Sequence, residues 1–237
     1  MASFAFHPST QCSRVQARVS FYAAGLFVLV LTLLHAVKHD LSPTWHVISE
    51  YEIGDHGWLM SIAFLSWAVS CLALAASLRP HITTRGGTVG LVLLLVTAVG
   101  MVLAALGTSD PITATKDELT THGKVHGFGA LLGIPGLLLA ATFISRSLSR
   151  NPAWAHARRW LIRTTVFAWL SLAVYGVAMI TMYDAEYGPD VKIGWPNRLI
   201  VATYCAWLMT TAAAAARIAA QRVAPQPARS WTAWLCV

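Results

Sequence analysis

Six long runs of apolar residues alternate with short polar segments along the chain. They cover Val19–Val37, Trp58–Leu78, Thr88–Leu106, Val125–Ser145, Trp160–Tyr183 and Leu199–Ile218. Each run is close to the roughly 20 helical residues that cross a hydrocarbon core. The apolar positions are continuous rather than alternating, which favours helices over the strands of a barrel. The pattern predicts an all-α polytopic membrane protein with six transmembrane helices in one bundle.

Composition supports this class. Of the 237 residues, 56% are hydrophobic and 11% are charged, whereas soluble domains carry about 25% charged residues. Gly129 and Gly133 form a GxxxG step, which is typical of close helix packing in membranes. We expect one transmembrane domain over residues 19–218, preceded by a cytoplasmic segment (1–18) and followed by a cytoplasmic interfacial tail (219–237).

The charges divide between the two ends of the expected bundle. Most of the 17 Lys and Arg residues lie near the termini, in the loop after the second run or in the loop after the fourth. The ten Asp and Glu residues all lie at the opposite end. By the positive-inside rule both termini are expected in the cytoplasm, with the acidic end facing the outer side of a bacterial inner membrane.

The net charge of +7 would normally raise nucleic acid as a partner. The sequence shows no basic patch interleaved with aromatic residues and no groove-reading motif. We therefore expect membrane lipids as partners, with the basic residues near anionic headgroups, and no nucleic acid.

Histidines gather at the acidic end. Glu118, His122 and His126 recur every four residues and therefore share one helix face. Thr115 and Glu118 also fit a capping box, which would start the helix before both histidines. His35 and His39 repeat the four-residue spacing at the end of the first run.

These pairs suggest three hypotheses for the polar end. Neutral imidazoles from two helices, with a carboxylate, could bind zinc. A b-type haem could instead take one axial histidine from each helix. The third hypothesis is a structural polar cap, in which the histidines hydrogen-bond headgroups, water or neighbouring carboxylates.

Other polar residues are expected at the same end. The segment Thr44–Met60 is too short and polar to span a membrane, and we interpret it as a re-entrant or interfacial turn that carries Ser49 and Glu50. Asp110 closes the third run, because Pro111 disfavours helix at the residue before it. Arg198 opens the sixth run and could pair with an acid or a headgroup.

Four motifs in this order resemble domain-of-unknown-function family 998, a group of bacterial and archaeal integral membrane proteins. The motifs are "ISEYEIGDHGWLM", "TSDP", "HGKVHGFGA" and "GWPNRL". The resemblance implies six membrane helices and a shared cluster at one face, and it implies no reaction. On these motifs the cluster is Ser49, Glu50, Asp110, His122, His126 and Arg198; His35 and His39 fall outside it.

The first function hypothesis is a metal-assisted hydrolase that acts on a lipid or amphiphile. His122 and His126 would be metal ligands, Asp110 a ligand or orienting group, and Glu50 a general base, with Ser49 as an alternative nucleophile. The residue types resemble those of membrane hydrolases such as alkaline ceramidases, which have seven spans. The second hypothesis is a non-catalytic subunit or lipid-binding module whose polar cap docks a partner membrane protein. The third is a haem-bearing electron carrier.

Overall fold

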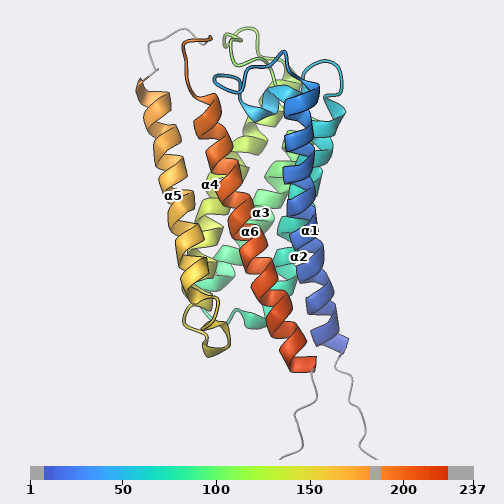
Figure 1. Ribbon diagram of the computed structural model, residues 1–237, viewed down its shortest axis with the longest axis vertical. Helices are drawn as coiled ribbons and strands as arrows, with labels where there is room; N and C mark the ends of the chain where they lie inside the picture. Colours follow the sequence, from blue (N-terminus) through green and yellow to red (C-terminus); the bar gives the residue numbers. More distant parts are fainter. Residues whose placement is uncertain (1–7, 182–187, 224–237) are drawn as a thin grey trace, which may run out of the picture.

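The computed structural model describes residues 8–181 and 188–223, and every regular element in this part is a helix (Figure 1). The long helices are α1 (Pro8–Val37), α2 (Trp58–Leu78), α3 (Arg85–Leu106), α4 (Thr121–Leu148), α5 (Arg158–Thr181) and α6 (Gly194–Val223). Three short 3-10 helices are η1 (Ile48–Glu52), η2 (Arg79–His81) and η3 (Pro152–Trp154). Each long helix contains a stretch long and apolar enough to cross a membrane. The predicted all-α bundle of six spans is confirmed.

The helices extend beyond the apolar runs that predict them. α1 begins at Pro8 rather than Val19, and α6 continues to Val223 rather than Ile218. Hydropathy marks only the part that lies in hydrocarbon, whereas backbone hydrogen bonding continues into the interface, where polar side chains meet water. Tyr183, the predicted end of the fifth run, and residues 224–237 of the predicted tail lie outside the described residues.

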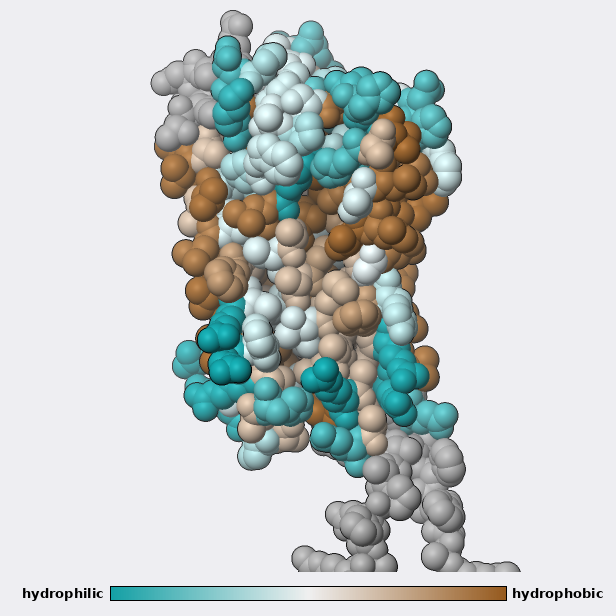
Figure 2. Space-filling view, in the orientation of Figure 1, coloured by the Kyte–Doolittle hydropathy of each residue, from teal (hydrophilic) through white to brown (hydrophobic). Residues whose placement is uncertain are grey.

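The helices stand side by side, and both described ends of the chain lie at the same end of the bundle (Figure 1). α3 packs mainly on α4, while α6 packs mainly on α1 and α5. We call the end formed by residues 38–57, 107–120 and 188–193 the polar cap, and the opposite end the arginine end. In Figure 2, hydrophilic residues gather at both ends, with an apolar belt between them.

Small residues allow α3 and α4 to touch along their backbones. A Cβ added to Gly129 would lie 2.5 Å from the carbonyl oxygen of Gly100 and 2.7 Å from the amide nitrogen of Ala104. Such distances exclude a side chain, so the glycine of the GxxxG step is required for this close approach. The contact fixes the position of α4 along the axis of α3, and therefore the position of the polar residues at the cap end of α4.

Candidate functional site

A buried arginine fixes the polar cap to the bundle. Arg198, near the start of α6, is only 8% exposed. Its guanidinium donates to the carbonyl oxygens of His46 at 2.7 Å and Gly194 at 3.0 Å, and to Tyr51 Oη at 2.8 Å. No described carboxylate forms an ion pair with it. Because a buried charge needs polar partners in place of water, Arg198 anchors segment 38–57 through hydrogen bonds alone.

His35 is part of this anchor. Its Nε2 accepts a hydrogen bond from Arg198 Nε at 2.7 Å, and its Nδ1 lies 2.7 Å from the carbonyl oxygen of Leu31. A carbonyl only accepts, so the hydrogen belongs on Nδ1 and the Nε2 lone pair points at the guanidinium. Neither nitrogen keeps a lone pair for a metal. His39, its predicted companion, lies exposed at the end of α1.

Glu50 joins segment 38–57 to segment 107–120. The side chain is 2% exposed. One carboxylate oxygen accepts from the backbone N–H of Val47 at 3.0 Å and lies 3.1 Å from His46 Nδ1. The other accepts from the N–H of Ile112 at 3.0 Å. Both carboxylate oxygens of Glu50 therefore make contacts inside the cap and connect its two segments. This geometry leaves neither oxygen open to a substrate, as the predicted general base would require.

A second buried carboxylate, Glu52, holds His126. Glu52 Oε2 lies 3.0 Å from His126 Nδ1 and accepts from the N–H of Ser109 at 3.1 Å. The same Nδ1 lies 3.0 Å from the carbonyl oxygens of Ala104 and Gly107. All these neighbours are acceptors, so Nδ1 carries the hydrogen. The interaction fixes both the tautomer and the orientation of the imidazole.

The other ring nitrogen of His126 is therefore the reactive one. Nε2 makes no hydrogen bond with any described residue, and the ring lines a cavity below the cap. Phe64 packs edge-on against the imidazole, with ring centroids 5.6 Å apart. His126 is 6% exposed, and its carboxylate partner is Glu52, whereas the metal-site hypothesis placed Asp110 beside it.

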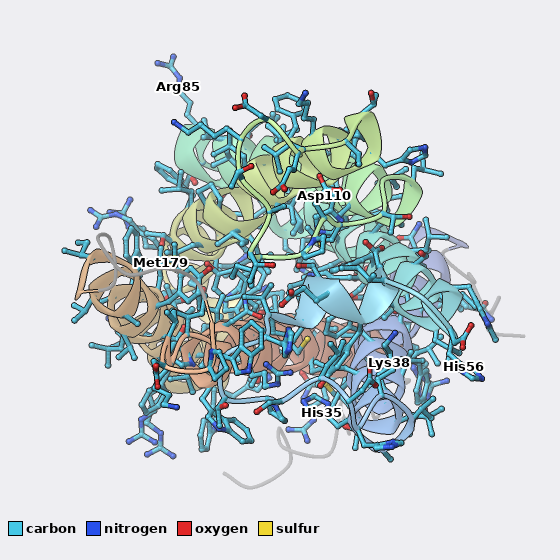
Figure 3. The ribbon with its side chains drawn as sticks, turned by 90° about the horizontal axis from the view of Figure 1, so that it is seen from above. His35, Lys38, His56, Arg85, Asp110 and Met179 are labelled. Atoms are coloured by element: carbon cyan, nitrogen blue, oxygen red, sulfur yellow. The ribbon has the colours of Figure 1, made fainter. Side chains whose placement is uncertain are left out.

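Asp110 instead caps the start of α4. Its two carboxylate oxygens accept from the N–H and the hydroxyl of Thr120, each at 2.8 Å. A Cβ added to Gly123 would collide with the same carboxylate, so the carboxylate sits directly on the first turn of the helix. A negative charge at a helix N-terminus is stabilising. In Figure 3, Asp110 and His35 lie on opposite sides of the cap.

The predicted capping box forms only in part. Glu118 accepts from the N–H and hydroxyl of Thr115, at 2.8 and 2.9 Å. These hydrogen bonds hold the pKa of Glu118 below its ordinary value. They close a separate turn, however, and α4 begins later, with Thr120 as its N-cap. Glu118 therefore lies off the helix that carries both histidines.

The described residues place the predicted metal ligands apart. His122 is exposed, Asp110 caps α4, and His126 is held by Glu52. Nowhere in residues 8–181 and 188–223 do three His, Cys, Asp or Glu side chains converge as a metal site requires. For the haem hypothesis, the imidazoles of His35 and His126 are directed to Arg198 and Glu52 rather than toward each other.

The cavity lies in the cap half of the bundle, between α2, α3, α4 and α6, with η1 as its roof. The cavity itself has a volume of about 80 Å³, and the space free of protein atoms rises to about 580 Å³ when its open mouth is included. Its walls are largely apolar, with contributions from Phe64, Met101, Ala130, Ile134 and Val201. An apolar hollow with a few polar groups is the usual form of a small-molecule site.

Polar side chains besides His126 also line this cavity, and the hydroxyl of one of them, Tyr204, donates to the carbonyl oxygen of Ile134 at 2.9 Å. Trp67 is 5% exposed, and its indole N–H has no hydrogen-bond partner. Asn197 uses its carbonyl oxygen to accept from the N–H of Ile48 at 3.0 Å, and its amide NH₂ bonds to no described residue. The Ser49 hydroxyl accepts a long hydrogen bond of 3.4 Å from Ser109 Oγ. The cavity thus offers two unused donors to a bound molecule.

Six membrane-spanning helices, closed at one end by a buried polar network over a cavity, define an integral membrane protein with a mainly apolar hollow inside the bundle. The chain matches the model of the family described as "Protein of unknown function (DUF998)" over residues 21–214, and it belongs to that family. No curated protein and no solved structure matches the chain.

Sequence reasoning missed Glu52, Asn197 and Trp67. Glu52 is two residues from Glu50 in the same motif. The signal that could have pointed to it was His126, because a buried histidine needs a hydrogen-bond acceptor. Asn197 precedes Arg198 inside "GWPNRL". Trp67 gave no signal, because a tryptophan inside an apolar run is indistinguishable from a packed one until its N–H is placed.

Proposed function

We propose that this protein binds an amphiphile in the cavity below the polar cap, with an acceptor-rich head group at the roof and its chain along the apolar walls. The observation that carries the proposal is that three residues lining an otherwise apolar hollow, Trp67, Asn197 and His126, each have a side-chain nitrogen that bonds to no described residue. A buried donor without an acceptor is costly. An ester carbonyl would accept from the N–H groups of Trp67 and Asn197, and Nε2 of His126, whose hydrogen is on Nδ1, would accept from a hydroxyl of the same head group.

The positive-inside distribution of arginines supports a cavity that faces the outer leaflet. On this proposal the buried network of Arg198, Glu50 and Glu52 keeps η1 in place as the roof. The network is positioning machinery, and the groups that touch the ligand are those that line the cavity.

Binding is tested with a myristoyl lysophospholipid as the probe and native mass spectrometry as the readout. Ala130→Leu adds bulk inside the cavity, while Gly127→Leu, on the same helix, adds it where nothing lies within 4 Å of a Cβ. We expect the first variant to lose most of the bound probe and the second to keep it. Equal probe retention by both variants would contradict the proposal.

The Glu52–His126 pair favours ester hydrolysis as a second candidate function. A carboxylate that fixes Nδ1–H leaves Nε2 as a general base toward the cavity. Nε2 would take a proton from water as the water oxygen bonds to the ester carbonyl carbon. The carbon–oxygen bond to the alcohol would then break, and the alcohol would leave with that proton.

This second candidate is tested with the same lysophospholipid by measuring release of myristate. Glu52→Gln and His126→Gln should each abolish release, and the release rate should fall at low pH as Nε2 becomes protonated. If wild-type protein binds the probe but releases no myristate at any pH, the binding function stands alone.

A further inference from the structure

A groove at the arginine end lies between the last turns of α4 and the first turns of α5. It combines exposed arginines, hydroxyls and apolar side chains in one place. The groove encloses about 820 Å³ of space free of protein atoms, including its open side. It is lined by Thr142, Ser145, Arg146, Ser149, Arg150, Arg158, Ile162, Thr165 and Val166. Three guanidinium groups therefore share one hollow with several hydroxyls and two apolar side chains.

The three arginines have no counter-ion among the described residues. The side chains of Arg146, Arg150 and Arg158 are exposed and form no hydrogen bond or ion pair with a described residue. The sequence explains this, since it contains no Asp or Glu from 56 to 109 or from 119 to 183. Every Asp and Glu side chain that the structure describes belongs to segments at the other end, so none of these can neutralise the groove, and we look for its anion outside the protein.

A hydroxyl in the groove is also unsatisfied. Ser149 Oγ is buried and has no hydrogen-bond partner. The neighbouring hydroxyls of Ser145 and Thr165 bond to each other at 3.0 Å, and Trp207 donates to Ser145 at 2.9 Å. The free hydroxyl of Ser149 can therefore donate to an oxygen of the same anion that the guanidinium groups attract.

The groove continues into an apolar strip on α5. Ile162, Val166 and Trp169 lie on one helix face and are 45%, 49% and 45% exposed. A strip of this kind beside a cationic pocket at the end of a membrane span suits a molecule with a charged head and a hydrocarbon tail. A free inorganic anion would use the pocket but not the strip.

We propose that this groove binds the phosphate of an anionic glycerophospholipid, with one acyl chain lying along Ile162, Val166 and Trp169. Arg146, Arg150 and Arg158 contact the phosphate, and the Ser149 hydroxyl donates to it. The proposal is independent of the cap cavity, because it involves the other end of the bundle and other helices.

The test compares two triple variants that remove the same charge from the same end of the bundle. The groove variant is Arg146→Gln, Arg150→Gln, Arg158→Gln. The control variant is Arg85→Gln, Arg159→Gln, Arg163→Gln, none of which lines the groove. Full-length proteins are placed in nanodiscs of equal phosphatidylglycerol and phosphatidylcholine, released, and analysed by native mass spectrometry for retained lipid.

Wild-type protein should retain phosphatidylglycerol over phosphatidylcholine. The groove variant should lose that preference by roughly tenfold to a hundredfold, because the hydrogen bonds of guanidinium groups to a phosphate are charge-assisted and strong. The control variant, whose arginines lie outside the groove, should stay within about threefold of wild type. Equal losses in both variants would overturn the proposal in favour of general surface attraction.

Inorganic phosphate provides the second arm of the test. If phosphate alone displaced phosphatidylglycerol at comparable concentration, the groove would be a free-anion site and the proposal would be wrong. Melting curves in uncharged detergent check the fold of each variant. If the groove triple does not fold, Arg150→Gln is compared with Arg85→Gln in its place, and equal lipid retention by these two overturns the proposal as well.

Discussion

The two ends of this bundle treat charge in opposite ways. At the cap end, Arg198, Glu50 and Glu52 are each less than 9% exposed, and each forms hydrogen bonds with a segment of the polar cap. At the arginine end, the side chains of Arg146, Arg150 and Arg158 are exposed and bond to no described residue. A buried charge with hydrogen-bond partners holds the surrounding segments in place. An exposed arginine without a partner in the protein is available to bind an external anion. The cap is thus a rigid roof, and the arginine end is a binding surface.

The largest expected effect breaks the anchor of the roof. Arg198→Met leaves the carbonyl of His46 and the hydroxyl of Tyr51 without their donor, and should cost about 3 kcal/mol of unfolding free energy. Arg85→Met, at an exposed arginine of the other end (Figure 3), should change it by less than about 0.5 kcal/mol. Unfolding in mixed detergent micelles measures both. Similar losses of unfolding free energy in the two variants would contradict the claim that buried charge stabilises the cap end and exposed charge does not stabilise the arginine end.

Neutralising the cap carboxylate Glu50 should have the next largest effect. Glu50→Gln replaces an acceptor with an N–H donor that must face Val47 or Ile112, at a cost of about 2 kcal/mol. Asp117→Asn, at an exposed position of the same end, is the matched control and should be nearly neutral. The comparison uses the same unfolding assay, and a neutral Glu50→Gln would show that the cap is not held as described.

A methyl group can test the Asp110 cap. Gly123→Ala places a Cβ against the Asp110 carboxylate and should displace it, costing about 1 kcal/mol of helix-cap stabilisation. Gly127→Ala, one turn further along α4, meets nothing within 4 Å. It should be neutral or stabilising. Equal thermal midpoints for the two variants would mean that Asp110 does not sit on the first turn.

The smallest expected effect concerns pH and the turn at Thr115. The lowered pKa of Glu118 means that its carboxylate favours the folded turn. That contribution is complete above the ordinary pKa of glutamate and is lost as pH falls through the lowered folded value. Hydrogen exchange of the Thr115 amide should therefore show declining protection under acid conditions in wild type, and little pH dependence in Glu118→Gln.

The fold was readable from the sequence because lipid imposes a simple rule. Long apolar runs must be helices, so six runs predicted six spans, and "TWHVISEYEIGDHGWLM" was correctly identified as a non-spanning segment, since it forms the loop that contains η1. The sequence singles out Arg198 and Glu50, but partners such as His35, Tyr51 and Ile112 lie far away in the chain, which spacing cannot reveal.

The same limit explains the choice between Asp110 and Glu52. The four-residue spacing of Glu118, His122 and His126 implied one helical face, but α4 starts after Glu118 and turns His122 outward. Which carboxylate reaches His126 depends on how η1 folds over α3, a tertiary contact without a local signal. The sequence motifs therefore predicted which end of the bundle holds these residues, but not which carboxylate contacts His126.

The central claim is that His126, fixed by Glu52, presents Nε2 to a ligand cavity. Imidazole ¹⁵N spectra of selectively labelled protein, with and without the myristoyl lysophospholipid, test it most directly. We expect a protonated Nδ1 that is unchanged by the probe, and an Nε2 resonance that shifts on addition in wild type but not in Ala130→Leu. An Nε2 resonance that ignores the probe, or that shifts equally in Ala130→Leu, would contradict the account.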